Sequence, residues 1–87
     1  ALYLAVEAGN IEIATMLLKR NIEINRQTIC GNTSLLRAIA INNIALTNLL
    51  LAHGADCNIA GNNGITPLFL AASLNLIPHI TALLDSG

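Results

Sequence analysis

The sequence predicts an all-α solenoid, in which antiparallel helix pairs stack side by side and β-hairpin or turn fingers project from them. The chain has 87 residues, of which 54% are hydrophobic, so it forms at most one domain. Gly31 and Gly64 lie 33 residues apart, and the same spacing recurs in the series Leu2, Leu35 and Leu68. Each period contains two short hydrophobic patterns of helical spacing with a polar break between them.

The middle copy shows the elements of one period. A first helix is expected over 34–41 and a second over 44–53, with Asn42 and Asn43 as the break between them. The segment HGADCNIAGNNG that follows carries three glycines and three asparagines, which indicates a loop. Because each first helix has only about two turns, packing against its neighbours has to stabilise it.

The stretch NNGITPLFLAASLN at 62–75 shows how a new copy begins. Gly64 permits a positive φ in a tight turn, and Thr66 can cap the coming helix with its hydroxyl group. Pro67 suits the first helical position, where its missing N–H costs nothing. We expect three residues of this helix to face the core: Leu68, Ala71 and Ala72.

These motifs resemble the ankyrin-repeat family, which has a 33-residue period, a β-turn with two helices, and a T-P-L-H-x-A signature. GITPLFLAA at 64–72 is close to that signature, with Phe69 in the histidine slot. HGADCN at 53–58 is similar to the family's G-A-D-V-N segment, with Cys57 in the valine slot. AGNIEIATMLLKRN at 8–21 resembles the second helix. The resemblance implies an ankyrin-repeat solenoid over the whole chain.

The register of this resemblance divides the single domain into repeats at 1–27, 28–60 and 61–87, of which the first and last are truncated. Terminal repeats of a solenoid usually carry a polar outer face, and neither end of this chain shows one. We therefore expect a piece of a longer array, with possible self-association through its uncapped ends.

Several positions depart from the family pattern. Asn42 and Asn75 replace the glycine between paired helices, and Asn also tolerates a left-handed conformation. Ser34 replaces the helix-start proline and can still cap the helix.

Two further departures concern the loops and one helix surface. Thr28 and Gly61 stand where the family often has an aspartate, which puts the usual capping of the hairpin in doubt. Arg37 stands where the other copies have Leu4 and Leu70. Its long side chain is either a stem lying along a helix edge or a charged contact with a partner.

The composition argues against chemistry and against nucleic acid. Only four residues are Lys or Arg and the net charge is −1, so the basic footprint of a nucleic-acid-binding protein is missing. The most apolar stretch, 39–52, is too short to span a bilayer. We expect no enzyme activity, no cofactor, no metal site and no direct membrane insertion.

The histidines and cysteines are expected to be structural. His53 and His79 lack carboxylates or thiols at metal-ligand spacing, so each is expected to be hydrogen-bonded within the fold. Cys30 and Cys57 could form a disulfide, but two reduced thiols are the expected state. Cys57 should be buried and inert, while Cys30 should be reactive at a finger tip.

The remaining candidate for function is a surface. Solenoids present an extended concave face, and the resemblance assigns partner contacts to the finger tips and the exposed ends of the first helices. Carried over by position, these contacts are Glu7, Ala8, Ile29, Cys30, Asn32, Ala40, Ile41, Asn62, Asn63, Ile65, Ser73 and Leu74.

Two functions fit this surface. The first is a non-catalytic protein–protein interaction module that binds one partner through the concave face. The second is an ankyrin segment of a multidomain enzyme, or of a secreted bacterial or viral effector, that positions a catalytic domain outside this chain. The opening residues lack a basic segment typical of a signal peptide, so we expect an intracellular, cytoplasmic location.

Overall fold

The computed structural model describes residues 2–20, 22–29 and 31–86. Within these residues, six α-helices follow one another in three pairs, and a short 3-10 helix lies in the second long loop. Their bounds are α1 (Leu2–Glu7), α2 (Ile11–Lys19), α3 (Ser34–Ala40), α4 (Ile44–Ala52), η1 (Asn62–Gly64), α5 (Pro67–Ser73) and α6 (Ile77–Ser86). The same residues contain no β-strand, which confirms the all-α class.

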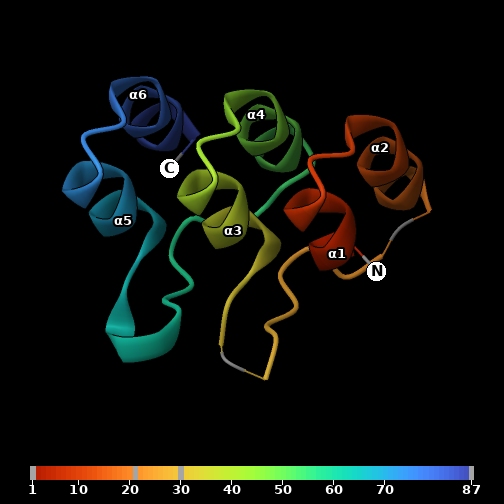
Figure 1. Cartoon of the computed structure of the whole chain (residues 1–87), viewed down its shortest axis with the longest axis horizontal. Helices are drawn as coiled ribbons and strands as arrows, with labels where there is room; N and C mark the ends of the chain where they lie inside the picture. Colours follow the sequence, from red (N-terminus) through yellow and green to blue (C-terminus); the bar gives the residue numbers. More distant parts are fainter. Residues whose placement is uncertain (1, 21, 30, 87) are drawn as a thin grey trace.

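The helices form two rows (Figure 1). α1, α3 and α5 lie side by side in an inner row, and α2, α4 and α6 form an outer row above them in this view, on the side away from the long loops. Within each row the middle helix packs against both neighbours, α3 against α1 and α5, and α4 against α2 and α6. Two long loops project from the inner row as fingers. This arrangement confirms the predicted stack of helix pairs.

The turn inside each pair depends on a left-handed residue. Gly9, Asn42 and Asn75 occupy the same place in successive pairs, with φ of 72°, 59° and 56°. In the middle pair the N–H of Asn43 then donates to the carbonyl of Ala38 at 3.0 Å. This bond satisfies a carbonyl group at the end of the helix. The prediction that asparagine replaces glycine here is confirmed.

Four helices begin with a side-chain cap. The side chains of Asn10, Thr33, Asn43 and Thr66 each accept a hydrogen bond from the N–H three residues on, at 3.1–3.2 Å. Thr66 therefore caps α5 as predicted, with a proline at the first helical position. The expectation that Ser34 caps α3 is wrong, because Thr33 is the cap and Ser34 is the first residue of the helix.

The core runs between the two rows of helices. Leu50 is fully buried, and Leu17 packs against the core from the first pair, as the repeat pattern predicts. The buried cluster consists of Leu2, Ala5, Val6, Ala14, Leu18, Leu35, Ala38, Ile39, Leu46, Leu50, Ala71 and Leu83. Alanines in this set let neighbouring helices approach closely, so short helices bury a continuous hydrophobic seam.

The predicted core of α5 is only partly correct. Ala71 is fully buried, but Leu68 is 41% exposed and Ala72 is also exposed. In the middle pair the corresponding residues, Leu35 and Ile39, are 2% and 0% exposed. The difference has a physical cause, because α5 covers that side of α3 while no further helix pair in the described chain covers that side of α5.

Hydrogen bonds close each finger and join the two. The N–H of Thr28 donates to the carbonyl of Asn32, and 33 positions later the N–H of Gly61 donates to the carbonyl of Ile65, both at 2.8 Å. The side-chain amide of Gln27 donates both to Gly31 in its own finger, at 2.8 Å, and to Ala60 in the next finger, at 3.1 Å. The fingers are therefore turns that support each other.

Candidate protein-binding groove

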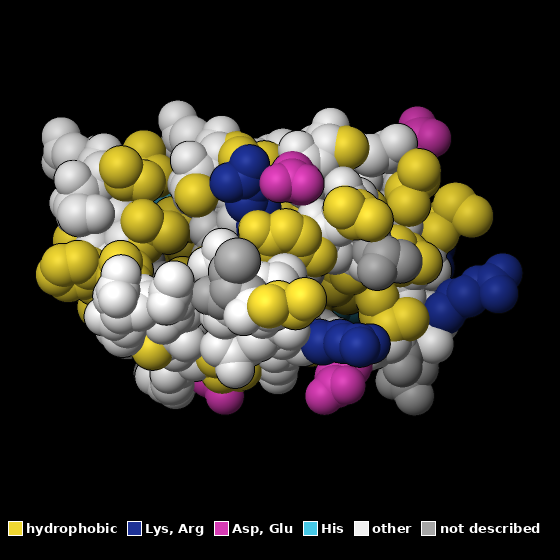
Figure 2. Space-filling model, turned by 60° about the horizontal axis from the view of Figure 1, so that its bottom comes forward, with side chains coloured by type: hydrophobic (Ala, Val, Ile, Leu, Met, Phe, Trp, Pro, Cys, Tyr) yellow, Lys and Arg dark blue, Asp and Glu magenta, His cyan; other side chains and the backbone are white. Residues whose placement is uncertain are grey.

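A hollow of about 230 Å³ lies between α3, α5 and the second finger. We call it the groove pocket, and its lining residues are Asn32, Leu36, Arg37, Ala40, Gly61, Asn62, Asn63, Ile65 and Leu70. Five of the predicted contact residues are in this set: Asn32, Ala40, Asn62, Asn63 and Ile65. Figure 2 shows the face from which the fingers project, where hydrophobic side chains surround one basic and one acidic group in contact.

The other predicted contact residues lie outside the groove pocket. Ile29 is fully exposed on the first finger, and Leu74 is 47% exposed at the end of α5. Ile41 is half-buried at the end of α3, and the exposed Ser73 donates its hydroxyl to the carbonyl of Leu70 at 2.9 Å. Glu7 and Ala8 are exposed near the end of α1, and Cys30 lies outside the described residues.

Two residues of the groove pocket were noticed in the sequence only as departures from the repeat. Arg37 replaces the leucine of the other copies, and its stem lines the groove pocket. Its Nη2 lies 3.3 Å from the Oε1 of Glu7 on α1. The side chains of Arg37 and Glu7 are 36% and 44% exposed, so solvent screens the pair and its contribution to stability is small. Arg37 is therefore more than a stem lying along the edge of a helix, because its end also forms an ion pair.

The Nε of Arg37 is different from its terminal nitrogen. This atom is buried, and among the described residues it has no hydrogen-bond partner. An unpaired donor on a charged group is unfavourable in a folded protein. Arg37 is therefore held in place by one weak ion pair, with part of its guanidinium group unsatisfied.

Gly61 allows the second finger to pack closely against α3 and the first finger beside the groove pocket. A Cβ atom at this position would lie 2.8 Å from Cδ1 of Leu36 and 3.2 Å from Oδ1 of Asn32. In the first finger the corresponding residue, Thr28, uses its hydroxyl to accept from the N–H of Asn32 at 3.2 Å. The first finger is therefore capped by a side chain, while the second has a glycine at the same place, with Leu36 and Asn32 close to it.

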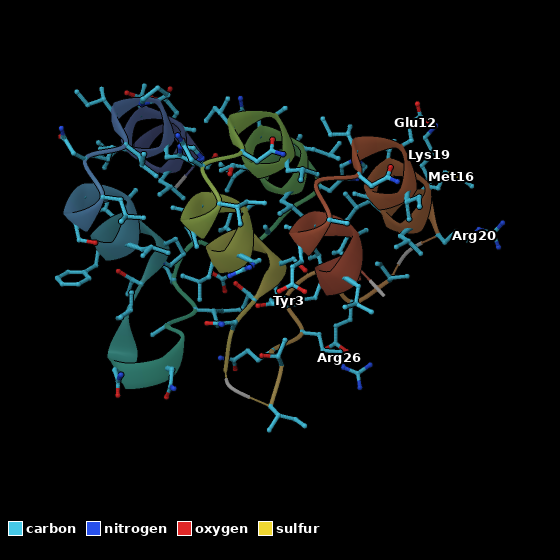
Figure 3. All side chains as sticks on the ribbon, viewed as in Figure 1. Tyr3, Glu12, Met16, Lys19, Arg20 and Arg26 are labelled. Carbon is cyan, nitrogen blue, oxygen red and sulfur yellow. The ribbon has the colours of Figure 1, made fainter. Side chains whose placement is uncertain are left out.

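The charge of the groove pocket comes from Arg37. The chain has four Lys and Arg residues, and Figure 3 shows Lys19, Arg20 and Arg26 at the α1–α2 end of the molecule, away from α5. The described lining residues include no carboxylate. The groove pocket therefore offers one cation, three asparagine amides and an apolar floor.

His79 is the most buried titratable side chain among the described residues, at 1% exposure. Neither ring nitrogen has a hydrogen-bond partner there, so the prediction of a hydrogen-bonded histidine is wrong. Burial lowers the pKa of His79, and the nearby backbone of Asn43, outside hydrogen-bonding geometry, offsets part of that effect. His79 occupies the repeat position of Leu46, which explains its apolar surroundings.

The other candidate groups have structural surroundings. Cys57 is a half-buried thiol with no disulfide partner in the described ranges, and burial, together with the charge of Asp56, raises the pKa of Cys57. His53 is exposed and ends α4. In the part of the chain that the structure describes, no three His, Cys, Asp or Glu residues gather as metal ligands would.

The repeated turns, caps and fingers agree with the comparisons with known proteins. A family profile described as "Ankyrin repeats (3 copies)" matches residues 2–87. The chain belongs to the ankyrin-repeat family. Two solved structures have the same fold over 99% of the chain: the ankyrin repeat domain of Bcl-3, with a TM-score of 0.94 and 32% identity, and an ankyrin repeat domain from Acinetobacter baumannii, with a TM-score of 0.90 and 33% identity. The match covers 38% and 46% of those chains.

The chain matches a part of several curated relatives. The chain is 34% identical to a mouse B-cell lymphoma 3 protein homolog over its whole length, and 36% identical to the putative ankyrin repeat protein FPV031 of fowlpox virus over 85% of its length. It is 37% identical to the rice potassium channel AKT1 over 78% of its length. The matches span only 20%, 22% and 7% of these relatives.

Membership of this family sets the general role of the chain. Ankyrin repeats are non-catalytic modules that bind protein partners. Over the described ranges, no helix is long and apolar enough to cross a membrane.

Proposed function

We propose that this ankyrin-repeat chain is a non-catalytic interaction module that binds a protein partner through its finger tips and the concave face of α1, α3 and α5. The groove pocket carries this proposal, because it brings five of the expected contact residues together in one hollow. Exposed apolar side chains flank it, Ile29 on the first finger and Leu74 after α5. Such surfaces often mark protein contacts.

The expected contact set of this module remains the one assigned by position, from Glu7 on α1 to Leu74 after α5, with Cys30 at the first finger. The partner is a protein rather than nucleic acid, since the concave face has a single basic residue near its centre. Intracellular location is part of the same proposal, because a free half-buried thiol such as Cys57 suits a reducing compartment.

A matched pair of substitutions tests the face. Ala40 and Ala52 are both exposed and both end their helices, α3 in the inner row and α4 in the outer row. A protein isolated with the full parent protein as bait would be titrated against the wild-type chain and the variants Ala40→Arg and Ala52→Arg. Ala40→Arg should lower its affinity by more than about tenfold, because the long side chain obstructs the groove pocket and disrupts the packing of the partner against it.

The control Ala52→Arg should leave affinity unchanged, since surface substitutions away from a contact are usually neutral. Circular dichroism should show both variants folded, because arginine is favourable at a helix C-terminus. Equal affinities of Ala40→Arg and wild type, or a loss confined to Ala52→Arg, would place the partner on another face and overturn the proposal.

The second candidate is a module that positions a catalytic or other functional domain outside this chain, in an enzyme or a secreted bacterial or viral effector. The rice channel favours this role, because its matching segment makes up 7% of a protein with a different main activity. The domain content of the parent reading frame tests it. A parent composed of ankyrin repeats alone would contradict this second candidate.

A further inference from the structure

Two departures from the internal repeat meet in the groove pocket. Arg37 stands where the equivalent residues are Leu4 and Leu70, and Gly61 stands where the equivalent residue is Thr28. Arg37 and Gly61 both line the same hollow. The repeat does not require arginine or glycine at these positions in general, because the other copies carry leucine and threonine there. Their convergence points to a site added to the repeat.

The two residues have different effects on the hollow. Gly61 lets the second finger approach α3 closely and so fixes the wall of the hollow, since any Cβ there would meet Cδ1 of Leu36 at 2.8 Å. Arg37 supplies its charge, with Nη2 3.3 Å from Glu7 and Nε buried without a partner among the described residues. The half-exposed ion pair with Glu7 is weak, so an oxygen ligand of the guanidinium group can replace Glu7 at little cost.

The size of the groove pocket limits what can fill it. At about 230 Å³ it is smaller than the roughly 300–1,000 Å³ typical of small-molecule pockets. That volume suits a single side chain of a partner rather than a cofactor. The hollow lies between α3, α5 and the second finger, so further repeats stacked on either end of the chain would leave it open.

The lining defines the chemistry of that side chain. Leu36, Ala40, Ile65 and Leu70 give an apolar floor, and the asparagine amides offer N–H donors. Arg37 is the single charged residue of the described lining. A planar guanidinium group matches the geometry of carboxylate and phosphate groups, and carboxylates are the anionic groups that the side chains of an unmodified protein offer. An acidic side chain with an aliphatic neighbour therefore complements both the charge and the floor.

We propose that the groove pocket is a subsite for an acidic side chain of the protein partner. This side chain replaces Glu7 as the ion-pair partner of Arg37, and an adjacent aliphatic side chain of the partner packs on the apolar floor. This inference rests on the proposed function, because it names the chemistry that the concave face recognises. It assigns recognition to Arg37, with Asn32 and Asn62 as donors beside it. Gly61 is a positioning residue, because it lets Leu36 and Asn32 keep their places in the lining.

A display selection tests the subsite with a peptide library in place of the partner. The probe is a library of random short peptides fused to a phage coat protein, so that side-chain carboxylates are the only ones presented. Peptides selected on the wild-type chain should be enriched in Asp or Glu next to Leu, Ile or Val. Their affinities would then be measured as synthetic peptides with amidated C-termini.

The variants place the residues of the other copies at these two positions. Arg37→Leu introduces the leucine of the other copies, and Gly61→Thr introduces the threonine of the first finger. Each should weaken the selected peptides by more than about tenfold, because Arg37→Leu removes the charged partner and Gly61→Thr displaces Leu36 in the pocket wall. Ala52→Arg on the outer row should have no effect.

Charge reversal gives the sharpest outcome. The double variant Glu7→Arg with Arg37→Glu keeps an ion pair between α1 and α3 but inverts the charge at the groove pocket. Selection on this variant should yield peptides enriched in Lys or Arg. A merely structural role of the ion pair would leave the selected sequences unchanged, because the pair itself is preserved.

The outcomes separate this inference from the proposed function. Peptides that lose binding with Ala40→Arg but lack acidic residues, or are unaffected by Arg37→Leu, would overturn the acidic subsite and leave the groove as the binding face. Peptides lost with Ala52→Arg instead of Ala40→Arg would overturn both. Failure to enrich any peptide would overturn the subsite, because a preformed pocket for one side chain should capture short ligands.

Discussion

The middle helix pair, α3 and α4, and the first and last pairs carry similar residues in very different surroundings. At one repeat position Ile13 is 47% exposed on α2, while Leu46 is fully buried on α4. At another, Leu36 is 3% exposed on α3, while Phe69 is 61% exposed on α5. The first position faces the preceding pair and the second faces the following pair.

This comparison shows that burial in the stack depends on the neighbour rather than on the residue type. None of the large exposed hydrophobic residues of the described chain lies on α3 or α4. Solenoid stability is approximately a sum of repeat and nearest-neighbour terms, so the middle pair contributes two such interfaces. The same substitution should therefore have different effects in different pairs.

The largest expected effect is at the Leu46 and Ile13 position. Leu46→Ala should lower the free energy of unfolding by about 2–5 kcal/mol, because it leaves a cavity in a fully packed site. Ile13→Ala should lower it by less than about 1 kcal/mol, since its side chain is half in water. Urea unfolding followed by circular dichroism measures both. Similar losses for the two variants would show that exposure does not control stability here.

His79 occupies the same position in the last pair, so it extends the comparison to a polar residue. His79→Leu restores the leucine of the middle pair, and should raise the free energy of unfolding by about 1–3 kcal/mol by removing unpaired buried nitrogens. If His79→Leu were less stable than the wild type, the imidazole ring would make favourable contacts that outweigh the cost of its unpaired nitrogens.

The pH dependence of the same variant gives a second measurement. Burial lowers the pKa of His79, so the unfolded chain, whose histidine titrates near about 6.5, binds more protons at mildly acidic pH. The free energy of unfolding of the wild type should therefore fall as the pH drops below about 6.5. The free energy of unfolding of His79→Leu should fall by less over the same range. Neither α4 nor α5, which pack against α6, contains a charged residue. If the free energies of unfolding of the wild type and of His79→Leu changed equally with pH, the burial of His79 would not be the cause of the pH dependence.

A smaller effect on the free energy of unfolding is expected at the turn inside each pair, because this turn is alike in the middle pair and in the last pair. Asn42→Ala should cost about 1–2 kcal/mol, the penalty for a left-handed residue with a Cβ and no local hydrogen bond. Asn75→Ala in the last pair should cost about the same, because both turns have nearly equal φ. Thermal unfolding of both variants tests this, and a clear difference between them would show that the turn depends on its neighbours.

At the first and last pairs we expect the smallest effect on stability but a clear effect on self-association. Phe69 and Ile77 are 61% and 65% exposed on the last pair, so the 9.1 kDa chain should self-associate as its concentration rises. Replacing both with serine should reduce the mass measured by sedimentation equilibrium, while stability changes by about 0.5 kcal/mol or less. A wild-type monomer at all concentrations would exclude these surfaces as contacts.

Local features of the fold could be predicted from the sequence, because they depend on a few adjacent residues. Thr66 caps its helix and Asn42 takes a left-handed conformation through interactions within one turn. Leu50 is buried because helical spacing places it on the face toward the inner row. Each of these follows from short-range rules that hold in any repeat of this kind.

Features that depend on neighbouring repeats could not be predicted. The exposure of Leu68 reflects what covers α5, and the unpaired nitrogens of His79 reflect the apolar side chains that α4 brings to it. The meeting of Arg37 and Gly61 in the groove pocket was missed for the same reason, since the two residues lie in different copies. Comparing the copies position by position marks both residues as exceptions, but only the fold places them together.

The side chain of Gln27, which bonds to Gly31 in its own finger and to Ala60 in the next, has a consequence for binding. Asn25 adds a second link, since its Oδ1 accepts from the N–H of Asp56 at 2.8 Å. Fingers tied together in the free protein have little conformational entropy left to lose when a partner arrives. Association should then resemble the docking of two rigid surfaces, with mutations in the groove changing mainly how long the complex lasts.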